Sequence, residues 1–92
     1  MVVGSLRVRL LLRESRTLKD KRQVVRSITD RLRNGFNVSV AEVDARDHRQ
    51  LAVLGIALVG SEVSPVRRTL EQIAQALRAH PVAEFLDHEL TV

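Results

Sequence analysis

The sequence contains no cysteine, tryptophan or tyrosine, and its only aromatic residues are two phenylalanines. Without cysteine, neither a disulfide framework nor a zinc site built on thiolates is possible. No apolar run is long enough to cross a bilayer, and Arg7 and Arg9 interrupt the N-terminal segment where a signal peptide needs an uninterrupted apolar region. We therefore expect a cytoplasmic protein with no membrane association.

Motifs of the common catalytic and nucleotide-binding classes are also missing. The chain has no glycine-rich phosphate loop, no H-E-x-x-H motif and no G-x-S-x-G motif. The apolar segment 51–59 carries no aromatic side chain on which a base of single-stranded RNA would stack. We therefore expect a non-enzymatic protein without a cofactor, and no base recognition by stacking on a sheet.

What the chain does have is a large supply of aliphatic side chains, since 45% of its 92 residues are hydrophobic. At this length one core has to serve a single domain, residues 1–92. Segments that alternate, or that are short and apolar between polar turns, predict four β-strands. They span residues 2–13, 37–44, 51–59 and 82–92. In the second of them the alternation slips after Val40, which predicts a bulge near Ala41.

Two segments have the period of amphipathic helices. The first begins at Thr17, where Thr17-x-x-Asp20 fits the spacing of a capping box, and Gly35 is expected to end it in the left-handed conformation. The second begins with Ser64 as its N-cap and Pro65 in its first turn. The predicted order is βαββαβ. With right-handed crossovers it gives an α+β ferredoxin-like sandwich, a four-stranded antiparallel sheet with both helices on one face.

Positive charge is concentrated in the first third of the chain. Residues 1–36 have a net charge of +7, whereas residues 37–92 have a net charge of −3. Four basic side chains of the first helix fall within roughly 60° of one another around its axis. A row of guanidinium groups suits phosphate oxygens, although charged helix faces are often merely solvated. The predicted nucleic-acid-binding residues are Arg16, Lys19, Arg22, Arg26 and Arg33.

Lys21 interrupts the apolar face of the first helix. It either extends to solvent from the first turn or lies over Glu42 and Asp44, which are two residues apart on a strand and would share one side. With Asp47 and His48 nearby, the same carboxylates would alternatively suit a divalent metal or an acid–base pair. We predict a structural ion cluster of Lys21, Glu42 and Asp44, and no metal site.

The second face of the predicted sheet indicates an interface. Because both helices would cover the other face, apolar side chains of the third strand would be exposed, and contiguous exposed apolar surface usually marks a contact. We expect a homo-oligomer, most simply a dimer, packed through this face. The predicted interface residues are Leu11, Val53, Ala57 and Val59.

Two blocks carry a family resemblance: LKDKR at residues 18–22 and FNVSVAEV at residues 36–43, supported by LGIA at residues 54–57. On these blocks, and over essentially the whole chain, the sequence resembles the YlxP-like family, a bacterial family of unknown function. The resemblance implies a ferredoxin-like, often dimeric domain with no established enzymatic activity. The family's genes tend to lie beside those for translation initiation and ribosome maturation, which implies a role connected with RNA or the ribosome.

Three hypotheses follow. The first is a non-catalytic factor that binds ribosomal or other structured RNA by contacts with its phosphates. The alternative is a protein-interaction or dimerisation module that works through the apolar sheet face and has no nucleic-acid role. The least supported hypothesis is an enzyme or small-ligand site at Lys21, Glu42, Asp44 and His48.

Overall fold

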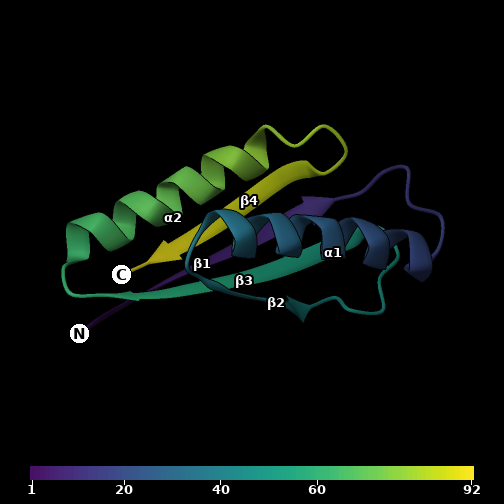
Figure 1. The fold of residues 1–92 in the computed structure, drawn as a ribbon. Helices are drawn as coiled ribbons and strands as arrows, with labels where there is room; N and C mark the ends of the chain where they lie inside the picture. The colour runs from purple at the N-terminus through teal and green to yellow at the C-terminus, as the bar shows by residue number, and fades with distance from the viewer.

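Six elements follow one another in the order βαββαβ in the computed structural model, which describes all 92 residues. They are β1 (Val2–Leu11), α1 (Leu18–Gly35), β2 (Ser39–Asp44), β3 (Leu51–Gly60), α2 (Val63–Arg78) and β4 (Glu84–Thr91). The strands form one antiparallel sheet in the order β2-β3-β1-β4, and both helices lie on the same face of it (Figure 1). The predicted α+β ferredoxin-like sandwich is confirmed. Neither helix is both long and apolar enough to cross a membrane.

The alternation of β1 decides which face of the sheet is which. Leu6, Val8 and Leu10 are buried beneath the helices, as their period of two predicts. They meet Leu70 of α2 and Ile28 of α1 in one hydrophobic core. Full burial of such a side chain contributes about 1.5–3 kcal/mol relative to leaving it exposed. The odd-numbered residues of β1 therefore point to the opposite, open face.

The capping box at the start of α1 is present. Oγ1 of Thr17 accepts a hydrogen bond from the N–H of Asp20 at 3.1 Å, and the carboxylate of Asp20 accepts one from the N–H of Thr17 at 3.2 Å. At the other end the predicted stop at Gly35 is confirmed, but its predicted left-handed conformation was wrong, because no glycine has a positive φ. The helix ends at Gly35 and is closed by the N–H of Phe36, which donates to Leu32 O at 2.9 Å.

The start of α2 also differs from the prediction. The helix begins at Val63 with Glu62 as its N-cap, and no side chain accepts a capping hydrogen bond. Ser64 therefore lies inside the first turn rather than before it. Pro65 remains in that turn, where its missing N–H costs no bond within the helix.

β2 contains a bulge, which lies at Val43 rather than near Ala41. The register with β3 shifts there, so that Glu42 is opposite Leu54 while Asp44 is opposite Val53. Neighbouring residues of β3 point to opposite faces of the sheet. The two carboxylates, predicted to share one side, therefore point to different faces: Glu42 toward the helices and Asp44 toward the open face.

His80 organises the connection between α2 and β4. Its Nδ1 accepts hydrogen bonds from the N–H groups of Val82 at 3.2 Å and Ala83 at 3.1 Å. Burial, and to a lesser extent the positive charge of Arg31, lower the pKa of His80 below its usual value of 6.5. Nδ1 can accept these hydrogen bonds only when it carries no proton, so the neutral imidazole is the form that fits the fold.

Lowering the pH from about 7 to about 5 is expected to destabilise the protein through His80. Because the pKa of His80 is lower in the folded protein, the unfolded chain binds the proton more readily. The stability that the neutral His80 contributes is therefore complete above the unfolded-state pKa and is lost as the pH falls below it. We expect the melting temperature of His80→Asn, whose side-chain oxygen accepts a hydrogen bond but does not titrate, to change less over this range. Equal pH profiles for the two proteins would contradict this role of His80.

Candidate nucleic-acid interface

Lys21 is fully buried: its side chain is 0% exposed, and its Nζ lies 2.7 Å from Oε2 of Glu42. The same Nζ donates to the carbonyl oxygens of Ala45 at 2.8 Å, Arg46 at 3.2 Å and Leu51 at 3.0 Å. These three bonds use all the protons of an ammonium group. The contact with Glu42 is therefore one of charge, and Oε2 has no hydrogen-bond donor. Of the two alternatives for Lys21, the structure therefore shows the buried one, in which it contacts Glu42, and not extension to solvent.

Lys21 holds the β2–β3 connection, residues 45–50, against α1. Ala45 in this connection has a φ of 53°, which is unusual for a residue with a side chain. Its carbonyl is held by Lys21, and its N–H donates to Oδ1 of Asp44 at 2.7 Å. The connection therefore keeps a costly local conformation because a buried charge on the helix fixes it.

Asp44 does not belong to the Lys21 cluster, contrary to the prediction. The bulge turns Asp44 to the open face, where its Oδ2 accepts a hydrogen bond from Nη2 of Arg7 at 3.1 Å. Arg7 is on β1 and Asp44 on β2, so this pair crosses β3, which lies between them. It crosses near Gly55, the register partner of Arg7, which has no side chain of its own and is overlaid by the side chain of Val43.

The other arginine of β1, Arg9, and the arginine that follows the strand, Arg13, also have carboxylate partners. Nη2 of Arg9 lies 2.6 Å from Oδ2 of Asp87, and Nε of Arg13 lies 2.7 Å from Oε2 of Glu84. The hydrogen bonds from Arg9 hold the pKa of Asp87 below its usual range. Exposed pairs of this kind add little stability, but they do neutralise charge. The open face thus neutralises its own arginines.

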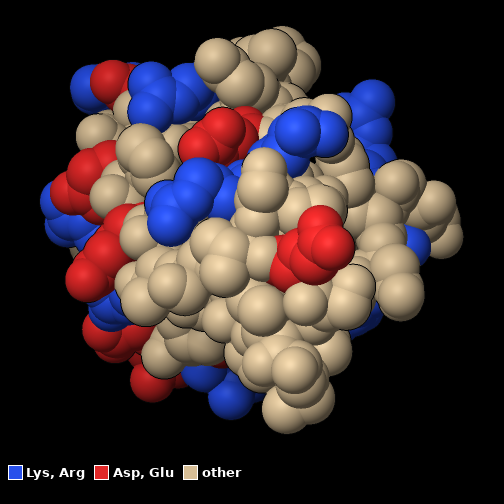
Figure 2. All heavy atoms as spheres, turned by 90° about the vertical axis from the view of Figure 1, so that its left-hand side faces the viewer, with Lys and Arg blue, Asp and Glu red and all other residues tan.

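These pairs change the predicted dimer surface. Val53, predicted to be exposed there, is only 2% exposed, because it lies in register between Arg9 and Asp44. Leu11 and Ala57 are partly buried, and Val59 alone of the four is open, at 63%. Val59 lies at the end of the molecule that carries both termini, where uncharged side chains cover most of the surface (Figure 2). Of the four predicted interface residues only Val59 is therefore exposed, while other exposed apolar side chains, such as Val43 on β2 and Leu86 on β4, lie elsewhere on the sheet.

The basic side chains of α1 are arranged differently. Arg22 and Arg26 are exposed and make no ion pair. Together with Arg46 from the β2–β3 connection they line a groove of about 480 Å³, the α1–β2 groove. Arg33 also lines it, and its Nη2 donates to Val40 O on the edge strand β2 at 2.7 Å. Sequence reasoning missed Arg46, although in this topology the β2–β3 connection returns to the end of the sheet where α1 begins.

The groove is not purely basic. Asp30, Asp47 and Glu42 also line it, and Glu42 is already matched by the charge of Lys21. The four arginines therefore exceed the carboxylates that remain unmatched. Of the predicted binding residues, Lys19 is exposed on α1 but does not line the groove, and Arg16 lines a separate hollow.

Comparison with known sequences identifies the family. The model of a protein family of unknown function, DUF503, matches residues 3–90. The chain belongs to this family. It is also 29% identical over 83 residues to the uncharacterized protein YlxP of Bacillus subtilis strain 168, an alignment that covers 90% of each chain. The resemblance to the YlxP-like family is thereby confirmed.

In this DUF503 protein the residues of the alternative acid–base or metal hypothesis do not converge. Glu42 contacts Lys21 beneath α1, and Asp44 contacts Arg7 on the open face. Nδ1 of His48 accepts hydrogen bonds from the N–H groups of Gln50 at 3.1 Å and of Leu51 at 3.0 Å. His48 therefore shapes the β2–β3 connection instead of joining the two carboxylates.

Proposed function

We propose that this DUF503 protein is a non-catalytic factor that binds structured RNA, such as that of the ribosome, through its α1–β2 groove. One observation carries the proposal: the unequal pairing of its arginines. Arg7, Arg9 and Arg13 each contact a carboxylate, whereas none of the basic groups on the outer surface of α1 makes an ion pair. A guanidinium without a carboxylate partner is free to bind phosphate oxygens with its fork of N–H groups.

The kind of RNA recognition follows from the same surfaces. The open face of the sheet carries ion pairs and no aromatic side chain, so it offers no platform for unstacked bases. Contacts from the four arginines that line the groove would go to phosphates, which fix position and orientation on a folded RNA without reading its sequence. Such a factor would act in the cytoplasm.

Binding to a structured ribosomal RNA fragment is expected to weaken steeply with salt. Neutralising four phosphates gives a slope of about −3.6 when the logarithm of the association constant is plotted against that of the salt concentration. Fluorescence anisotropy of a labelled fragment at graded salt measures this slope. No binding even at low salt, or a slope near zero, would overturn the proposal. Because the chain lacks tryptophan and tyrosine, strong absorbance at 260 nm in a purified sample would independently reveal bound nucleic acid.

The alternative function, a protein-interaction or dimerisation module, has one supporting observation. Val3 and Val59 are opposite each other in β1 and β3, and both are exposed. A homodimer formed at this end of the sheet would bury them and would leave the α1–β2 groove accessible. Dimerisation at that end is therefore compatible with RNA binding at α1.

A further inference from the structure

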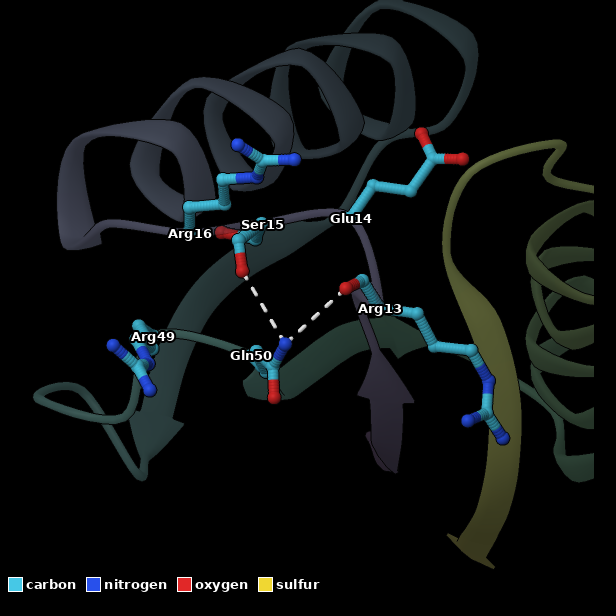
Figure 3. Close-up of a pocket in the computed structure, with 6 residues that line it drawn as sticks. All are labelled: Arg13, Glu14, Ser15, Arg16, Arg49 and Gln50. Atoms are coloured by element: carbon cyan, nitrogen blue, oxygen red, sulfur yellow. Dashed lines mark hydrogen bonds between the residues drawn. The ribbon is translucent and has the colours of Figure 1, made fainter.

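A second hollow shares no lining residue with the α1–β2 groove. It has a volume of about 750 Å³ and is formed where the β1–α1 connection meets the β2–β3 connection (Figure 3). No hydrophobic side chain lines it. Its lining residues are Arg13, Glu14, Ser15, Arg16, Arg49 and Gln50.

Only two of the charged groups around this hollow remain available to a ligand. Arg13 extends toward β4 (Figure 3), where it is paired with Glu84, and Glu14 carries a negative charge that repels a phosphate. Arg16 and Arg49 make no ion pair, and they come from the two different connections. The hollow is therefore bordered by two arginines from separate segments of the chain, whose side chains do not point toward each other in Figure 3.

The start of α1 does not supply the positive character of this hollow. The carboxylate of Asp20 already accepts the N–H groups of Arg16 at 3.0 Å and Thr17 at 3.2 Å. The bond from Arg16 is the largest cause that holds the pKa of Asp20 below its usual range. The helix end is thus capped within the chain, and the positive charge available in the hollow comes from the side chains of Arg16 and Arg49.

The two walls of the hollow are joined by hydrogen bonds. Nε2 of Gln50 donates to the carbonyl oxygens of Arg13 at 3.2 Å and Ser15 at 3.4 Å (Figure 3). The N–H of Leu12 donates to Gln50 O at 2.7 Å, and the buried hydroxyl of Ser15 donates to Thr17 O at 3.2 Å. A site whose walls are already fixed loses less entropy when a ligand binds.

We propose that this hollow binds a second phosphate of the RNA that occupies the α1–β2 groove, so that the RNA straddles the β2–β3 connection. Arg46, near the start of this connection, lines the groove, and Arg49, near its end, lines the hollow. The ligand class is a phosphate group held by Arg16 and Arg49, either an internal phosphodiester or a terminal phosphate. This inference rests on the proposed RNA-binding function and adds a second, separate contact to it.

The test compares three double variants that remove the same amount of charge. Arg16→Gln with Arg49→Gln is expected to weaken binding of the labelled RNA fragment about tenfold and to reduce the magnitude of the salt slope by about 1.8. Arg22→Gln with Arg26→Gln tests the α1–β2 groove. Arg67→Gln with Arg68→Gln, on the exposed surface of α2, is the matched control, since neither of those arginines makes an ion pair.

The outcomes separate this inference from the proposed function. If the α1 variant loses affinity while the Arg16/Arg49 variant matches the α2 control, the second site is refuted and the groove stands. If the unaltered protein binds no RNA, the proposed function itself fails. Repeating the measurement with fragments that carry or lack a 5′-phosphate identifies the source. A loss in the Arg16/Arg49 variant confined to the 5′-phosphorylated fragment assigns a terminal phosphate, and an equal loss on both fragments assigns an internal phosphodiester.

Discussion

Replacing Lys21 with methionine is expected to lower the free energy of unfolding by about 3–5 kcal/mol, the usual cost of removing one partner from a buried ion pair. The side chain of Glu42 would remain mostly buried without a counter-charge, and the carbonyls of Ala45, Arg46 and Leu51 would lose their donor. Methionine keeps most of the volume, so the loss would come from the charge and its hydrogen bonds. Denaturation followed by far-UV circular dichroism measures it, because the chain has no tryptophan for fluorescence.

Two further variants show whether the buried charge causes this loss. In Lys21→Met with Glu42→Leu no charge is left unpaired, so a large part of the stability is expected to return. Lys19→Met, two residues earlier on the exposed side of the same helix, should change the free energy of unfolding by no more than about 0.5 kcal/mol. A loss below about 1 kcal/mol in Lys21→Met would refute the structural role assigned to the ion pair.

The fold could be predicted because its signals are local. The period of two in β1 and the capping box at Thr17 each depend on residues within a few positions of one another. Each element carried such a signal, and all of them agreed with one topology. The errors at Gly35 and Ser64 concern only how a helix ends or where it begins, and helix ends depend on which neighbouring groups satisfy the terminal N–H and C=O groups.

The site was harder to predict because it depends on contacts between distant segments. Lys21 is buried because carbonyls more than twenty positions along the chain surround its ammonium group. Asp44 left the predicted cluster because a single bulged residue, Val43, reverses the direction of the side chain that follows it. Val53 is covered because it lies between charged side chains of two neighbouring strands. None of these three outcomes is encoded in a local pattern.

The positions of the basic groups on α1 could be predicted from the helical period, but their pairing could not. Arg9 and Arg22 look alike in the sequence, yet Arg9 is paired with Asp87 while Arg22 has no carboxylate partner. This difference is visible only once β4 is placed beside β1. It also leaves the outer face of α1, unlike the open face of the sheet, with guanidinium groups that have no carboxylate partner.

Reversing the charge of Arg22 and Arg26 to glutamate is expected to weaken binding of structured RNA by about 100-fold at physiological salt, or about 2.7 kcal/mol. The double variant removes two phosphate contacts and puts two negative charges against the RNA. Both side chains are exposed and donate no hydrogen bond to the rest of the protein, and glutamate forms helices about as well as arginine. The melting temperature should therefore stay close to that of the unaltered protein while the anisotropy titration shows the loss.

The matched control is Arg67→Glu with Arg68→Glu, which changes the net charge equally on the exposed surface of α2. If the α1–β2 groove is the contact surface, this variant should lose only the small part of the affinity that comes from the overall field of the protein. Equal losses in the two double variants would mean that RNA responds to net charge alone and would remove the argument for the groove. A charge-reversed α1 that binds as well as before, in a protein whose oligomeric state is also unchanged, would instead favour an interaction module that works through the sheet.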